Sequence, residues 1–61
     1  MDDTDRRIVA LLQENARRSF KDIGDRVHLS APAVKRRVDR LEADGVIRGY
    51  SAAVDPRAFG W

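Results

Sequence analysis

The chain has 61 residues, with twelve Lys or Arg against ten Asp or Glu and a formal net charge of +2 at pH 7. This length allows one small domain with a marginal core, because a chain of this size buries only about 60% of its unfolded surface. The sequence contains no cysteine, which excludes disulfides and thiolate metal sites. It has neither an apolar run of membrane-spanning length nor the basic start of a secretory signal, so we expect a soluble cytoplasmic protein with no membrane partner.

A first helix is predicted over residues 3–15. Asp2 is a suitable N-cap, acidic residues fill the first turn, and apolar residues recur at helical spacing at Ile8, Leu11 and Leu12. The acidic cluster of Asp2, Asp3 and Asp5 could also be considered as a metal site. Capping is the favoured interpretation, because no histidine or further carboxylate converges on the cluster.

A second, short helix is predicted over residues 20–27, with Ser19 as its N-cap and Asp22 at the capping-box position. Gly24 within this helix would cost about 1 kcal/mol relative to alanine. Close approach of another helix would explain the glycine, and simple tolerance in a packed context is the alternative. His28 follows in a turn, where a positive φ is often required. As the only histidine, with no nucleophile nearby, it is interpreted as a turn residue rather than a catalytic base.

A third helix is predicted over residues 31–44. Ser30 caps it, Pro32 lies in the first turn, where a missing N–H costs nothing, and Gly45 follows its end. Apolar stripes on the second and third helices consist of Phe20, Ile23 and Val27 and of Val34, Val38 and Leu41. The join between the two helices is short enough to require a sharp turn, so the pair is predicted to form a helix-turn-helix.

Positive charge is concentrated on this pair of helices. Residues 17–40 hold eight basic side chains against three acidic ones, a net charge of +5, and ten of the twelve basic residues in the chain are arginine. Such a concentration favours a polyanionic partner, and the forked guanidinium suits phosphate and guanine. The alternative is that the arginines only form solvated helix faces.

The pattern changes after Gly45. Residues 46–54 are extended in character, with Ile47, Tyr50 and Val54 as expected sheet contacts and Gly49 as a bulge or kink. Phe59 and Trp61 are unusually apolar for an exposed tail. Because a strand cannot stand alone, we expect this segment to pair with a region outside the sequence or with another chain.

Four motifs together carry a family resemblance. They are D-x-x-D-R-x-I at residues 2–8, L-S-x-x-A-V-x-R-R-V-x-R-L-E at residues 29–42, G-V-I-R-G-Y at residues 45–50 and V-D-P at residues 54–56. In this order and spacing, the chain resembles the N-terminal DNA-binding domain of the Lrp/AsnC (feast/famine) transcription regulators over nearly all of its length. It departs from the family at His28, where glycine is usual, and at Gly24, where alanine is usual.

The resemblance implies an all-α domain with a short C-terminal β-strand or wing, that is, a three-helix winged helix-turn-helix. Residues 1–46 would be the DNA-binding domain. Residues 47–61 would be a strand and hinge leading to a C-terminal effector and oligomerisation domain that this sequence does not include. In the family that domain forms dimers and higher oligomers and binds amino acids or related effectors. The partners implied are double-stranded DNA, a second copy of the chain and, only through the other domain, an amino-acid-type effector.

Sequence-specific DNA binding, with the third helix in the major groove, is the leading functional hypothesis. Ser30 and the helix start at Ala31 are expected at phosphate. Pro32, Ala33 and Arg36 are expected at base edges, with Arg36 forming a forked contact to guanine. Phosphate contacts are expected from Lys35, Arg37 and Arg40 on the third helix and from Lys21 on the second. The dimer or interdomain residues are expected to be Ile47, Tyr50, Val54, Phe59 and Trp61.

Two other classes of function stay open. A winged-helix module can serve protein–protein assembly, and some relatives of this family are haem-pathway decarboxylases. The chemistry of such an enzyme would lie in the other domain, because this sequence has no acid–base pair or metal cluster. We therefore expect no enzymatic activity and no cofactor. A nucleoid-associated regulator of a bacterial or archaeal cytoplasm is the predicted setting.

Overall fold

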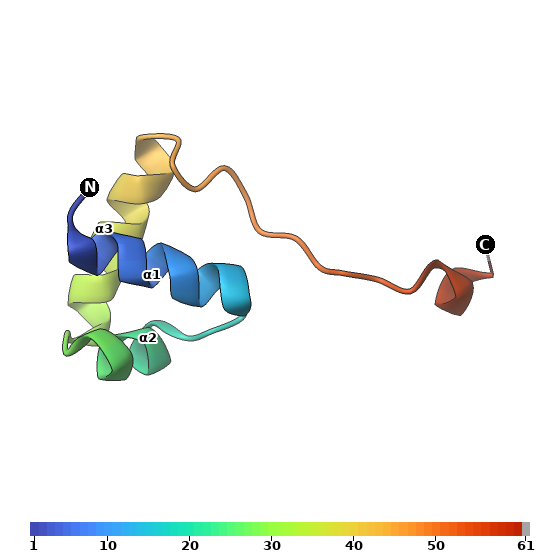
Figure 1. The fold of residues 1–61 in the computed structure, drawn as a ribbon, viewed down its shortest axis with the longest axis horizontal. Coiled ribbons are helices and arrows are strands. Elements are labelled where there is room, and N and C mark those ends of the chain that lie inside the picture. The colour runs from blue at the N-terminus through green and yellow to red at the C-terminus, as the bar shows by residue number, and fades with distance from the viewer. Residues whose placement is uncertain (61) are drawn as a thin grey trace.

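The computed structural model describes residues 1–60, apart from the side chain of Phe59. It contains three α-helices, α1 (Asp3–Glu14), α2 (Phe20–Val27) and α3 (Ala31–Ala43), followed by the short 3-10 helix η1 (Pro56–Phe59). α1 and α3 cross, α2 lies near the start of α3, and the chain beyond α3 leaves this body as an extended trace (Figure 1). The predicted three-helix helix-turn-helix is confirmed.

Each α-helix begins at a side-chain cap. Asp2 accepts a hydrogen bond from the backbone N–H of Asp5 at 2.8 Å, and Ser19 accepts one from Asp22 at 3.0 Å. At the start of α3, the Ser30 hydroxyl accepts the N–H of Ala33 at 3.3 Å. These bonds satisfy donors that have no partner within the helix, so each helix start is determined by its own local sequence.

The core is a single apolar cluster shared by the three α-helices. Its buried members are Ile8, Ile23, Val27, Val34 and Val38, with Leu41 also buried. Partly buried side chains pack around them, namely Leu11, Leu12, Phe20, Leu29 and Ile47. Ile47 thus attaches the start of the extended segment to the core.

Two positive φ angles determine how α2 and α3 end. His28 has φ 62° and ψ 43°, and its N–H bonds to the Gly24 carbonyl, which confirms its interpretation as a turn residue. Gly45 has φ 76°, its N–H donates to the Glu42 carbonyl, and the N–H of Val46 donates to the Leu41 carbonyl. That pair of bonds is a Schellman motif, and it terminates α3 one residue before the predicted end.

Gly24 is buried, but its close neighbour is not a helix, contrary to the prediction from the sequence. A Cβ at this position would overlap the carbonyl oxygen of Leu29, which belongs to the turn between α2 and α3. The glycine therefore makes room for the turn backbone.

The predicted strand is not formed within residues 1–60 of the chain by itself. Residues 48–55 have no regular structure, and Tyr50 and Val54 are 50% and 53% exposed. A strand requires a neighbouring strand to bond its backbone, and the described part of the chain supplies none. The wing is consequently not formed here. Of the other residues expected to pair, Trp61 and the side chain of Phe59 lie outside the described residues.

Candidate nucleic-acid interface

Eight of the nine expected DNA-binding residues lie on α3 or at its cap, where the helix places them within four turns. They are Ser30, Ala31, Pro32, Ala33, Lys35, Arg36, Arg37 and Arg40. Pro32, Lys35, Arg36 and Arg40 are exposed. Val34, Val38 and Leu41 attach the opposite side of α3 to the core. The ninth residue, Lys21, is exposed on α2.

The basic side chains expected to bind DNA differ in what they contact. Lys35 pairs with Asp39 at 2.6 Å and Lys21 pairs with Asp25 at 3.3 Å, in each case one helical turn away. Exposed ion pairs of this kind contribute little to folding stability, so a DNA phosphate can replace the carboxylate as the partner of the lysine. Arg36 and Arg40 form no ion pair with any residue that the structure describes. Their guanidinium donors are available, and their i, i+4 spacing places them on one side of α3.

Arg37 is held by the start of α1. Its Nη1 donates to both carboxylate oxygens of Asp2, at 3.0 and 2.8 Å, and to Oδ1 of Asp5 at 3.0 Å. The hydrogen bond from Arg37, with that from the Asp5 backbone N–H, lowers the pKa of the Asp2 carboxyl, and the carboxylates raise the pKa of Arg37. Asp2 thus caps α1 and ties it to α3. The cap can be predicted from the sequence, whereas the contact with α3 cannot.

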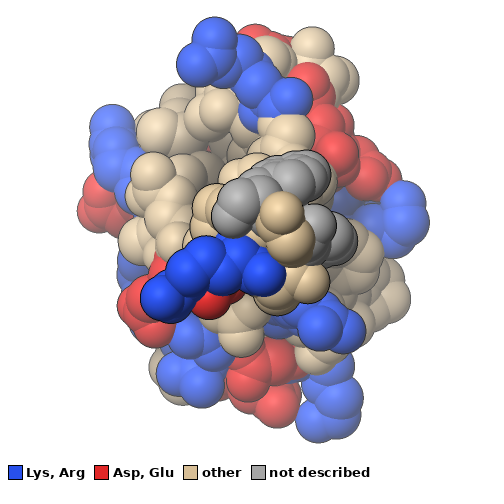
Figure 2. Space-filling view, turned by 90° about the vertical axis from the view of Figure 1, so that its right-hand side faces the viewer, with Lys and Arg blue, Asp and Glu red and all other residues tan. Residues whose placement is uncertain are grey.

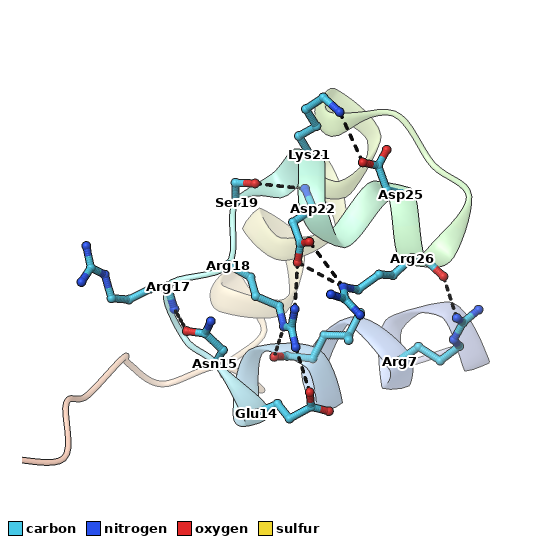
Figure 3. A network of polar contacts seen from close by, with 11 residues as sticks. Arg7, Glu14, Asn15, Arg17, Arg18, Ser19, Lys21, Asp22, Asp25 and Arg26 are labelled. Carbon is cyan, nitrogen blue, oxygen red and sulfur yellow. Dashed lines mark hydrogen bonds and ion pairs between the residues drawn. The ribbon is translucent and has the colours of Figure 1, made fainter.

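A second set of arginines serves the fold. The Arg18 side chain is 12% exposed and donates to the Leu11 carbonyl at 3.1 Å, to Asp22 at 2.9 Å and to Glu14 at 2.8 Å (Figure 3). Its three donors connect the end of α1 to the start of α2. These hydrogen bonds, chiefly the one to Asp22, raise the pKa of Arg18.

The same polar network extends along α2 to the start of α1. Arg26 donates to Asp22 at 3.2 Å, and Arg7 donates to the Arg26 carbonyl at 2.7 Å (Figure 3). Part of the positive charge of residues 17–40 is therefore engaged in ion pairs within and between the helices rather than available to a partner. The i, i+4 spacing of Arg18 and Arg26 to Asp22 could have indicated this from the sequence.

On the face that carries the C-terminal segment, Lys and Arg side chains are interspersed with Asp and Glu around uncharged surface (Figure 2). The described residues include no group of three or more His, Cys, Asp or Glu arranged to hold a metal ion. Nor is any helix within residues 1–60 long and apolar enough to cross a membrane.

Comparison with known proteins assigns this arrangement to a family. Residues 1–42 match the AsnC-type helix-turn-helix domain. The HTH-type transcriptional regulator Rv2324 of Mycobacterium tuberculosis is 59% identical over 61 residues, which are 100% of this chain and 41% of that protein. The chain thus spans about two fifths of the length of that relative.

Solved structures agree in fold. The leucine response regulatory protein LrpA of Mycobacterium tuberculosis superposes with a TM-score of 0.86 at 43% identity, covering 98% of this chain and 41% of that one. The transcriptional regulator NMB0573 of Neisseria meningitidis, in complex with L-Met, gives a TM-score of 0.87 at 37% identity, covering 97% and 38%. These relatives are transcriptional regulators rather than enzymes. The chain belongs to the AsnC-type helix-turn-helix family and is a DNA-binding domain of an Lrp/AsnC transcriptional regulator.

Proposed function

We propose that this domain recognises a specific sequence of double-stranded DNA by placing α3 in the major groove. The observation that carries the proposal is the pair Arg36 and Arg40, which are exposed one helical turn apart and form no ion pair within residues 1–60. Arginine is the side chain that most often reads guanine, through two donors to O6 and N7. Arg36, nearer the start of α3, reads a base, while Arg40 contacts phosphate.

The start of α3 contributes both close approach to the bases and contacts to phosphate. Pro32 and Ala33 face the base edges as small apolar surfaces that allow the helix to approach closely. The Ser30 hydroxyl oxygen accepts the Ala33 N–H and keeps its own O–H as a donor, so a phosphate at this end would meet that O–H, the N–H of Ala31 and the positive end of the helix dipole. Lys35 and Lys21 reach phosphates by exchanging their carboxylate partners. Arg37 borders the face and can do so only once its bonds to Asp2 and Asp5 open.

A winged-helix module for protein–protein assembly is the competing function. The distribution of charge on α3 favours DNA binding over protein binding, because the outer side of the helix carries available cations while its inner side is apolar. A protein-docking face would be expected to be richer in aromatic residues and poorer in charge.

The whole protein is proposed to act as a homodimer or higher oligomer in the cytoplasm of a bacterium or archaeon. The segment 47–61 would form the strand and hinge, with Ile47, Tyr50, Val54, Phe59 and Trp61 at the dimer or interdomain contact. The exposure of Tyr50 and Val54 supports that role. An amino-acid-type effector would bind to a part of the protein outside this chain, as suggested by the L-Met complex of the Neisseria relative.

Two matched substitutions on α3 test the DNA-binding proposal by fluorescence anisotropy. The probes are a duplex enriched from a randomised pool and a scrambled duplex of the same length, each titrated with the chain over a range of salt. Arg36→Ala should cost about 1–3 kcal/mol on the enriched duplex and much less on the scrambled one. Lys35→Ala should weaken both alike and reduce the salt slope by about one unit. Equal losses from Arg36→Ala on the two duplexes would contradict base reading by this residue.

A further inference from the structure

The ion cluster formed by Asp2, Asp5 and Arg37 joins residues that are 35 and 32 positions apart in the sequence. The side chains are 58%, 15% and 35% exposed, so the cluster lies at the surface with one carboxylate largely covered. All three contacts use Nη1 of Arg37. Its Nε and Nη2 form no hydrogen bond with the residues that the structure describes. Arg37 is therefore anchored at one nitrogen and compensated in charge by two carboxylates.

This cluster directly borders the proposed DNA face, which is the outer side of α3 that carries Arg36 and Arg40. One surface groove is lined by Leu29, Ala33, Arg36 and Arg40 together with Asp2, Asp5 and Arg37. Two carboxylates thus lie at the edge of a surface whose other charged members are available arginines. A phosphate approaching this edge meets Asp2 and Asp5 as well as Arg37.

We propose that Asp2 and Asp5 limit the sequence-independent part of DNA affinity by keeping Arg37 in an intramolecular ion pair instead of a phosphate contact. Each phosphate neutralised by a basic side chain releases counterions and adds to affinity on any sequence. An arginine whose charge is already compensated contributes little to this release. The inference rests on the proposed function, because it requires α3 to face DNA.

Asp2 is suited to a test because asparagine can replace it without removing the cap of α1. Asparagine is as good an N-cap as aspartate, and its side-chain oxygen can still accept the Asp5 N–H. Asp2→Asn therefore removes one of the two negative charges that face Arg37, at small cost to the stability of the fold. Asp3→Asn is the matched control. Asp3 lies in the same helical turn and the change in net charge is identical, but Asp3 is 98% exposed and pairs with Arg6.

The experiment measures the affinity of the chain for a random-sequence duplex between low and moderate salt, with circular dichroism confirming that each variant is folded. Asp2→Asn should steepen the slope of log K against log salt by up to about 0.9, the value for one further phosphate contact. That added contact corresponds to about threefold more loss of affinity between 50 and 200 mM salt. Asp3→Asn should change the slope much less. In the Arg37→Ala background, Asp2→Asn should have no more effect than Asp3→Asn.

A contrast within α3 completes the test. Arg40→Ala should reduce the salt slope by about 0.9, whereas Arg37→Ala should change it little, because that charge is already compensated. If Asp2→Asn and Asp3→Asn give equal salt slopes while the wild-type chain binds duplex normally, the proposed effect of Asp2 and Asp5 on Arg37 is wrong. The proposed DNA-binding function is then unaffected. An absence of salt-dependent duplex binding by the wild-type chain would overturn the proposed function itself, and the restraint with it.

Discussion

At the scale of single residues, one backbone conformation and one guanidinium carry most of what is unusual in this domain. His28 adopts the left-handed region, which costs roughly 1–2 kcal/mol for a residue with a Cβ. The Arg18 side chain donates three hydrogen bonds, each from a different nitrogen, to acceptors on α1 and α2. The left-handed conformation of His28 is locally unfavourable but forms the turn, and Arg18 connects α1 to α2.

His28→Gly should raise the free energy of unfolding by about 1 kcal/mol, because glycine adopts positive φ without steric cost. Urea denaturation followed by circular dichroism measures the change. His28→Ala is the control, since alanine keeps the Cβ and should not stabilise the domain. A gain from alanine equal to that from glycine would indicate that the imidazole, and not the backbone, is unfavourable here.

Arg18→Met should lower the Tm clearly, because the methionine retains apolar contact but leaves the Leu11 carbonyl and the carboxylates of Asp22 and Glu14 without this donor. Arg17→Met is a neighbouring control with the same change in charge at an exposed side chain. Thermal melts at identical ionic strength compare the two variants. Similar Tm values would show that the Arg18 network adds nothing beyond net charge.

At the scale of elements, the turn between α2 and α3 depends on two residues at once. A Cβ on Gly24 would overlap the Leu29 carbonyl oxygen, and Leu29 directly follows His28. The left-handed conformation of His28 therefore contributes to the position of this carbonyl. Gly24 and His28 are thus connected through this turn.

Gly24→Ala should destabilise the domain by about 1–3 kcal/mol, because the Leu29 carbonyl has to shift. In the His28→Gly background the same change should cost less, since a glycine allows the turn to adjust. A double-mutant cycle measured by urea denaturation gives this coupling. Gly49→Ala, where nothing lies within 4 Å of the new Cβ, is the control for an added methyl group. Strict additivity of the two changes would contradict the connection through the turn.

The contact of α1 with α3 through Asp2 should make stability depend on pH. The pKa of Asp2 is lowered in the folded state, chiefly by the hydrogen bond from Arg37. Its contribution is therefore complete above the unfolded value of about 3.9 and is lost as the pH falls through the lower folded pKa. Asp2→Asn should flatten the decrease of the urea midpoint below about pH 4, and Asp3→Asn should flatten it less. Asp22, whose pKa is lowered chiefly by Arg18, contributes in the same direction.

At the scale of the whole molecule, the chain consists of a three-helix body and an extended segment. The radius of gyration is 13.6 Å, against about 10 Å expected for a compact domain of this length. Ile47 packs against the core, whereas Tyr50 and Val54 are about half exposed. The segment therefore presents apolar side chains and unbonded backbone beyond the body, which is a surface suited to pairing with another strand.

Two chains should pair through residues 47–54 in antiparallel fashion at high concentration. Such a dimer would place two α3 helices on one face, and tethering should raise DNA affinity by about 10²- to 10⁴-fold if the spacing fits the duplex. Sedimentation of the chain and of a version ending at Tyr50 tests this pairing. Strictly monomeric behaviour of both at millimolar concentration would assign dimerisation wholly to parts of the protein outside this chain.

The sequence by itself determined the helices, their caps and the turn that joins α2 to α3. Asp2, Ser19 and Ser30 act on backbone donors within three residues, and His28 and Gly45 act through their own φ angles. Such short-range interactions can be recognised in the order of residues because their partners stand nearby in the chain. The apolar stripes on α2 and α3 similarly indicated the core.

Only the tertiary structure decided which long side chains are available and whether a strand forms. Arg36 and Arg37 are neighbours in the sequence, but Arg37 meets Asp2 and Asp5 from more than 30 residues away, while Arg36 faces outward. The Gly24 contact likewise depends on how the turn folds back over α2. Ile47, Tyr50 and Val54 have the composition of a strand, yet a strand forms only where a second strand bonds its backbone, and composition does not supply that partner.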